Sequence, residues 1–92
     1  MSERAVAEVT ICNEKGLHAR AASKFTQLAS QYECRVVVSR GTVQVNGKSI
    51  MNLLLLAAAQ GSTLRIEVHG AASESCLREL VNLVSSGFGE AV

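Results

Sequence analysis

The 92-residue sequence predicts an α+β fold of two layers, in which helices pack on one face of a β-sheet. Four strand-like stretches and three helical patterns follow one another in the order βαββαβα. Nearly half of the residues are hydrophobic and few are aromatic, so we expect a core of Val, Leu, Ile and Ala. No linker, repeat or low-complexity segment is visible, and residues 1–92 are therefore expected to form a single domain.

The first strand and the first helix are predicted by two different periods. Apolar and polar side chains alternate from Ala5 to Cys12, which is the period of a half-buried strand. Asn13 to Gly16 has the composition of a loop, and a helix is expected from Ala19 to about Gln31. The apolar face of this helix contains Ala22, Phe25, Leu28, Ala29 and Tyr32.

A hairpin is expected after this helix. The valine-rich stretch from Arg35 to Ser39 predicts the second strand, and Arg40-Gly41 suits a tight turn. Thr42 to Val45 then forms a short third strand, which Asn46-Gly47 ends.

The second helix has a clear start and an ambiguous end. Ser49 is a good N-cap for a helix that begins at Ile50. Periodicity alone continues this helix to Gln60, with Gly61 as its stop.

The last two elements are a strand and a helix. Thr63 to His69 alternates as the fourth strand. Ser73 is expected to cap a final helix from about Glu74 to Ser86, and Glu74 suits its first turn. The inner positions of this helix are Leu77, Leu80, Val81 and Val84.

Composition excludes several classes of function. The formal net charge of +1 gives no field for binding nucleic acid or an anionic membrane. Cys12, Cys34 and Cys76 lack metal-ligand spacing and are odd in number, which favours reduced thiols in the cytoplasm. Met1 to Arg4 leads into no signal peptide, and the longest apolar run, Leu53 to Ala59, is too short to span a bilayer.

The candidate functional stretch is Gly16 to Ala22, where the first loop meets the first helix. His18 stands at the helix start, where the first backbone N–H groups, including those of Ala19 and Arg20, lack helical partners. These donors and the helix dipole favour an anion such as phosphate. The Arg20 guanidinium adds donors suited to phosphate oxygens. The alternative interpretation is a histidine that merely starts a helix beside a solvated arginine.

The sequence Gly16-Leu17-His18-Ala19-Arg20 resembles the active-site motif of HPr, the histidine-containing phosphocarrier family of the bacterial phosphotransferase system. The chain length, the order of elements and Asn46-Gly47-Lys48-Ser49-Ile50-Met51 also resemble that family. The resemblance implies an open-faced sandwich with a four-stranded antiparallel sheet, and a second helix that ends near Leu55. One departure is Ala21, where many members carry proline.

The resemblance also implies a function. His18 would accept a phosphoryl group on Nδ1 from Enzyme I and pass it to an Enzyme IIA-type protein, with Arg20 assisting. Such a protein is a carrier in a relay and not an enzyme with turnover. It needs no cofactor or metal, is expected to be a monomer in the cytoplasm, and serves either sugar transport or nitrogen regulation.

A regulatory site and a docking surface are implied near the second helix. Family members with serine in a Lys48-Ser49-Ile50-Met51 setting are modified by HPr kinase/phosphorylase, so Ser49 is a candidate regulatory phosphorylation site as well as an N-cap. Lys48, Ile50, Met51 and Leu54 form the expected partner-binding surface, and the flexible thioether of Met51 suits such a role.

Other interpretations are weaker. A nucleic-acid-binding α+β module lacks basic clusters and stacking aromatics, and a small phosphatase would use Arg20 as its phosphate cradle. Gly47-Lys48-Ser49 resembles the end of a P-loop, but position 42 is threonine where that motif needs glycine. His69 is expected to be structural or solvated.

Overall fold

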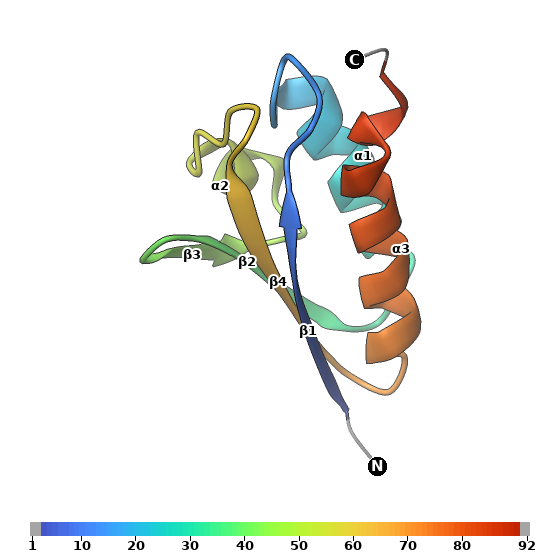
Figure 1. Ribbon diagram of the computed structural model, residues 1–92. Helices are drawn as coiled ribbons and strands as arrows, with labels where there is room; N and C mark the ends of the chain where they lie inside the picture. The colour runs from blue at the N-terminus through green and yellow to red at the C-terminus, as the bar shows by residue number, and fades with distance from the viewer. Residues whose placement is uncertain (1–2, 91–92) are drawn as a thin grey trace.

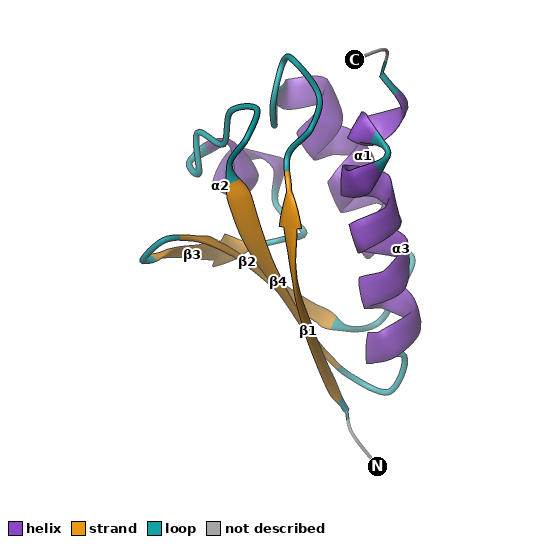
Figure 2. Ribbon diagram, in the orientation of Figure 1, coloured by secondary structure: helices purple, strands orange, loops and turns teal. Residues whose placement is uncertain are grey.

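The computed structural model describes residues 3–90 and has the expected α+β fold, an antiparallel sheet with helices on one face (Figures 1 and 2). Met1, Ser2, Ala91 and Val92, which belong to the predicted domain, lie outside the described residues. The elements in chain order are β1 (Arg4–Thr10), α1 (Ala19–Ala29), β2 (Arg35–Arg40), β3 (Val43–Asn46), α2 (Ile50–Leu54), β4 (Thr63–His69), α3 (Ser73–Ser85) and the 3₁₀ turn η1 (Gly87–Gly89).

The strands lie in the order β1-β4-β2-β3, and every neighbouring pair is antiparallel. β4, which comes last of the four strands in the sequence, is therefore inserted between β1 and β2, which is a split βαβ arrangement. β1 pairs with β4 along its whole length, from Arg4 opposite His69 to Thr10 opposite Thr63. β2 and β3 form the predicted hairpin, but its turn lies at Gly41-Thr42, one residue later than the expected Arg40-Gly41.

The two faces of the sheet have different surroundings. On β4, Leu64, Ile66 and Val68 are buried and alternate with the half-exposed Arg65, Glu67 and His69. α1 and α3 lie on one side of the strands, and no helix within residues 3–90 covers the opposite side (Figure 2). The hydrophobic core therefore lies between the sheet and these helices. None of the helices within residues 3–90 is long and apolar enough to cross a lipid bilayer.

The core is largely aliphatic, as expected, with Phe25 and Phe88 as its two buried aromatic side chains among the described residues. Periodicity placed most of the inner positions correctly, although Leu28, Tyr32, Leu77 and Val81 are only partly buried. Ala21 and Cys76, which were not expected in the core, are fully buried.

α1 ends two residues before the predicted end. Ser30 at the C-cap still donates to Thr26 O, but Gln31 and Tyr32 donate to carbonyls only three residues back. The final turn has therefore tightened from α-helical to 3₁₀-type hydrogen bonds, which is common at helix ends.

α2 ends at Leu54, which confirms the end near Leu55 that the resemblance implied, and the continuation to Gln60 that periodicity alone predicted is wrong. Leu55 and Leu56 complete the last turn, and Ala57 then adopts a left-handed backbone with φ of +48°. The apolar residues beyond the helix still enter the core, since Leu56 and Ala58 are buried. Burial of an irregular segment thus explains an apolar pattern that resembled a longer helix.

The prediction that Ser73 caps α3 is also wrong. The helix already includes Ser73, Ala72 occupies the N-cap position, and no side chain caps the helix there. The backbone N–H of Ser73 donates to Gly70 O in the preceding tight turn, and the side chain is turned inward and buried. Its Oγ has no hydrogen-bond partner among the described residues.

Candidate functional site

The loop between β1 and α1 is fixed by close backbone contacts. Gly16 has φ of +68°, and a Cβ at this position would lie 2.6 Å from Ala58 O. The next residue, Leu17, donates its backbone N–H to the same carbonyl at 2.9 Å. Only glycine combines this backbone angle with this approach, so Gly16 determines how the chain enters α1.

His18 is the N-cap of α1. Its backbone is extended, and its ring nitrogen Nδ1 accepts a hydrogen bond from the backbone N–H of Arg20 at 3.2 Å. A nitrogen that accepts this bond carries a lone pair and no proton. The reactive lone pair of the half-exposed ring is therefore directed at the positive end of the helix.

The other ring nitrogen of His18 is bound by Glu90. Nε2 forms a hydrogen bond with Glu90 Oε2, while Glu90 Oε1 accepts from the side-chain amide of Asn13 at 3.0 Å. The hydrogen bond from His18, supported by that from Asn13, lowers the pKa of the Glu90 carboxyl, although desolvation opposes the change. A carboxylate beside Nε2 assigns the ring proton to that nitrogen.

Basic and acidic side chains together line a hollow of about 390 Å³ beside the site. It is lined by Glu14, Lys15, Arg20, Lys24, Gly89 and Glu90. The Arg20 side chain is exposed and makes no hydrogen bond to another residue within 3–90. Its guanidinium is thus available for an anion that arrives near His18.

Asn13, Lys24 and Glu90 were not predicted as site residues. Lys24 Nζ donates to Phe88 O at 2.7 Å, which ties the segment that carries Glu90 to α1. His18 and Glu90 are separated by 72 positions in the chain. No local pattern in the sequence signals such a contact, because it depends on how α3 packs beside α1.

The expected docking surface is exposed on α2. Met51 is 79% exposed, and Ile50 and Leu54 are also exposed, while Leu53 is buried. Leu55, at 72% exposure, extends this apolar surface and was not predicted. We call Ile50, Met51, Leu54 and Leu55 the α2 surface.

Ser49 and Lys48 hold the start of α2. Ser49 Oγ accepts from the backbone N–H of Asn52 at 3.2 Å and from its side-chain amide at 3.0 Å, so the predicted N-cap is present. Lys48 Nζ donates to Tyr32 O at 2.6 Å. The charge of Lys48 thus binds a carbonyl just beyond α1, and the lysine is only half-exposed.

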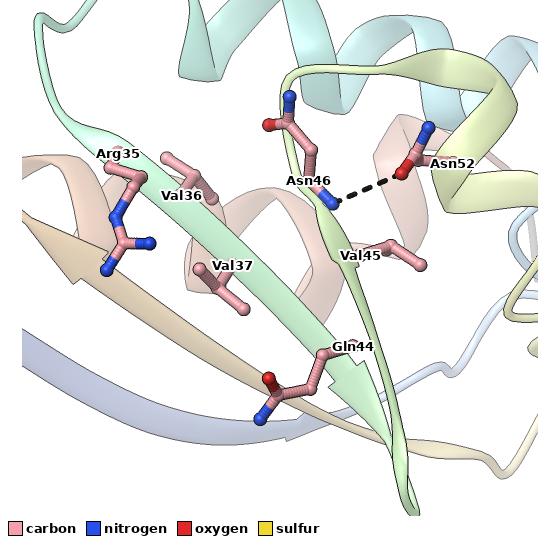
Figure 3. Close-up of a pocket in the computed structure, with 7 residues that line it drawn as sticks. All are labelled: Arg35, Val36, Val37, Gln44, Val45, Asn46 and Asn52. Atoms are coloured by element: carbon pink, nitrogen blue, oxygen red, sulfur yellow. Dashed lines mark hydrogen bonds between the residues drawn. The ribbon is translucent and has the colours of Figure 1, made fainter.

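Two further features lie away from His18. His69 is on the uncovered face of the sheet, where its Nε2 contacts Glu67 Oε2 at 2.7 Å, in keeping with a structural role. A second hollow of about 430 Å³ lies along β2 and β3, beside the hydrogen bond from Asn46 N to Asn52 Oδ1 (Figure 3). Within residues 3–90, no group of three or more His, Cys, Asp or Glu side chains could hold a metal ion.

The fold and the site define a small α+β protein whose half-exposed histidine caps a helix and is held by a carboxylate. Residues 5–86 match the family described as "PTS HPr component phosphorylation site". The chain belongs to this family, the HPr phosphocarrier proteins of the phosphotransferase system.

Individual relatives and structures agree with this assignment. The phosphocarrier protein HPr of Neisseria meningitidis is 48% identical over 82 residues, which cover 89% of this chain and 92% of that protein. The phosphocarrier protein NPr of Shewanella violacea is 36% identical over 84 residues, covering 91% and 92%. The crystal structure of HPr-C-His from Thermoanaerobacter tengcongensis superposes with a TM-score of 0.92 at 35% identity, covering 96% of this chain and 99% of that one.

Proposed function

We propose that His18 accepts a phosphoryl group from phospho-Enzyme I and donates it to an Enzyme IIA-type protein. The observation that carries this proposal is the hydrogen bond from Arg20 N–H to His18 Nδ1. It supports an unprotonated Nδ1 at the N-terminus of α1, where a nucleophile and an anion-binding site coincide.

The transfer consists of two displacements at phosphorus. In the first, the Nδ1 lone pair forms a bond to phosphorus while the bond to the donor protein breaks and its electron pair stays with the donor. In the second, the acceptor's nucleophile attacks, and the Nδ1–phosphorus electron pair returns to the ring. The ring proton stays on Nε2 throughout, so no proton acceptor other than Glu90 is needed near His18.

The groups around Nδ1 are suited to the transferred phosphoryl group. Its oxygens would replace Nδ1 as acceptors for the backbone N–H of Arg20 and lie near that of Ala19, at the end of α1. The free guanidinium of Arg20 would stabilise the charge that develops during transfer. Partners would bury the α2 surface while their own reactive group approaches His18.

The test is phosphorylation by phosphoenolpyruvate and Enzyme I, followed by detection of an acid-labile, base-stable phosphate. His18→Ala should fold normally and accept no phosphate, whereas His69→Ala should be labelled as wild type. Enzyme IIA proteins from the sugar and nitrogen branches are then offered the labelled protein in parallel, because relatives carry both the HPr and the NPr name. Normal labelling of His18→Ala would reject the proposal.

Ser49 is, in our proposal, a regulatory site for HPr kinase/phosphorylase. It is half-exposed at the start of α2, and Asn52 provides two donors to its Oγ. A phosphate there would add about −1.5 to −2 charge, which the helix start tolerates. The hydrated anion would stand beside Ile50 and Met51 and hinder a partner that must bury them.

We further propose a monomeric protein that acts in the cytoplasm. Cys12, Cys34 and Cys76 are free thiols, which suits a reducing compartment. Light scattering of the purified protein should give the molecular mass of a monomer at every concentration of a dilution series.

A further inference from the structure

We propose that Glu90 is a positioning residue that selects Nδ1 of His18 as the nucleophile, and that the segment Gly87–Glu90 is a strap built to hold it there. This inference rests on the proposed phosphoryl transfer and adds a determinant of which ring nitrogen reacts. The carboxylate lies against Nε2, while the backbone N–H of Arg20 lies against Nδ1.

The strap has an uncommon backbone. Gly87, Phe88 and Gly89 have φ angles of +69°, +58° and +75°, so three consecutive residues are left-handed. Phe88 is not a glycine, and the left-handed conformation is unfavourable for a residue that carries a Cβ. Such a conformation persists only where the surroundings hold it, and it is often found at functional sites.

The surroundings hold the strap at two points. The Phe88 ring is fully buried in the core, and its carbonyl accepts a hydrogen bond from Lys24 Nζ at 2.7 Å. Lys24 lies on α1, the helix that His18 caps. The strap is thus tied to the same element that orients the imidazole.

Asn13 directs the carboxylate itself. It is fully buried, and its Nδ2 donates both to Gly16 O at 2.9 Å and to Glu90 Oε1 at 3.0 Å. With Oε1 bound to Asn13, Oε2 points to His18. The loop before α1 and the strap after α3 therefore converge on one carboxylate with both oxygens occupied.

The chemical consequence follows from the two tautomers of imidazole. A neutral ring carries its proton on either nitrogen, and only the other nitrogen can attack phosphorus. A carboxylate at Nε2 holds the proton there, as the aspartate does for histidine in a serine-protease triad. After transfer the ring bears both a phosphoryl group and a proton, and Glu90 compensates its positive charge.

The first experiment needs no partner protein. ¹⁵N NMR of the full chain, at a pH where the ring is neutral, reports the His18 tautomer. The wild type should show the proton on Nε2, and Glu90→Ala should shift the ring toward a mixture of tautomers. Glu14→Ala is the matched control, because Glu14 lines the same hollow and contributes no bond to His18 among the described residues. An unchanged tautomer in Glu90→Ala would overturn the inference.

The role of the strap is tested through Lys24. Lys24→Met should shift the tautomer in the same direction as Glu90→Ala, and the double variant should match Glu90→Ala alone. Lys15→Met, which removes a neighbouring exposed ammonium, should leave the spectrum unchanged. An additive double variant would show that Lys24 does not act through Glu90.

The second experiment measures transfer. Glu90→Ala should accept phosphate from Enzyme I roughly 10- to 100-fold more slowly, by analogy with the loss of carboxylates that orient metal-binding histidines. ³¹P NMR should reveal some phosphate on Nε2 in this variant and none in wild type. Equal rates and a single Nδ1 product would refute the inference while the carrier function stands. An unlabelled wild type would refute the carrier function, and the tautomer measurement would still decide the role of Glu90.

Discussion

The carbonyl of Ala58 lies where a side chain at Gly16 would have to be, because an added Cβ would come within 2.6 Å of that oxygen. The same carbonyl accepts the Leu17 N–H. The segment after α2 and the loop before α1 are therefore joined by backbone contacts at Gly16 and Leu17, directly before His18.

Gly16→Ala should destabilise the fold by about 3 kcal/mol, since it combines a left-handed alanine with a clash against backbone. Urea unfolding measures this change. Gly41→Ala is the control, because Gly41 has a similar φ of +61° and open space around its Cβ. Equal losses in the two variants would show that the approach to Ala58 contributes nothing.

Arg20→Ala should slow phosphoryl transfer about a hundredfold, because a donor that stabilises developing charge is lost. The labelled nitrogen should stay the same, since Glu90 and the helix N-terminus still hold the ring. Arg20→Lys should restore the rate only partly, because an ammonium lacks the planar fork of donors. Stopped-flow or quench-flow labelling by Enzyme I gives the rates, and a normal rate for Arg20→Ala would exclude this role.

Substitutions at Ser49 separate capping from regulation. Ser49→Ala should lose about 1 kcal/mol of stability, through the missing bonds from Asn52, and transfer phosphate normally. Ser49→Asp should melt close to wild type, because a carboxylate also caps a helix, yet accept phosphate from Enzyme I more slowly. If Ser49→Asp accepted phosphate as fast as wild type, only the capping role would be left.

Glu67 makes stability depend on pH at the acid end. Its carboxylate accepts from Arg4 at 2.9 Å, from Arg65 at 2.8 Å and from His69 at 2.7 Å. The hydrogen bond from Arg4 is the largest of the causes that lower the pKa of Glu67 to about 2, from a usual value of 4.5. The folded protein thus binds a proton at Glu67 less readily than the unfolded chain does.

The direction in which pH changes the stability follows from the difference in proton binding between the folded and unfolded states. Because the folded pKa of Glu67 is the lower one, its stabilising contribution is present above about pH 4.5 and is lost as the pH falls toward 2. Urea unfolding from pH 6 to 2 should show a shallower acid loss in Glu67→Gln than in wild type. Glu79→Gln, on the exposed side of α3, should follow the wild-type curve. If the stability of Glu67→Gln and of wild type fell equally with decreasing pH, the stabilising role of the Glu67 hydrogen bonds would be contradicted.

The order of elements and most of the core could be predicted from the sequence, because period and turn residues are local signals. β4 was predicted with its correct bounds, and the left-handed Gly41 occupies the turn where it was expected. The end of α2 could not be found this way, since Leu56 and Ala58 are buried in irregular chain and continue an apolar period without continuing a helix.

Only those residues of the candidate site that lie close together in the sequence could be predicted. His18 at the start of α1 and Arg20 are two positions apart in the sequence, and their placement at the helix start matches the expectation. Glu90 and Asn13 are polar residues near a loop or a chain end, where such residues are common and carry no signal. Their role becomes visible only once packing brings the strap to the loop.

The inserted position of β4 governs when the site can form during folding. β1 is an edge strand that pairs with β4. The start of the following loop is bound to the segment before β4, because Ile11 N–H donates to Ser62 O and Gly61 N–H donates to Ile11 O. α1 can form from local contacts. The loop that orients His18 becomes ordered only when β1 pairs with β4, and such pairing between distant parts of the sequence is slow. During refolding, phosphate acceptance should therefore return with β1–β4 pairing and lag behind the recovery of helical signal.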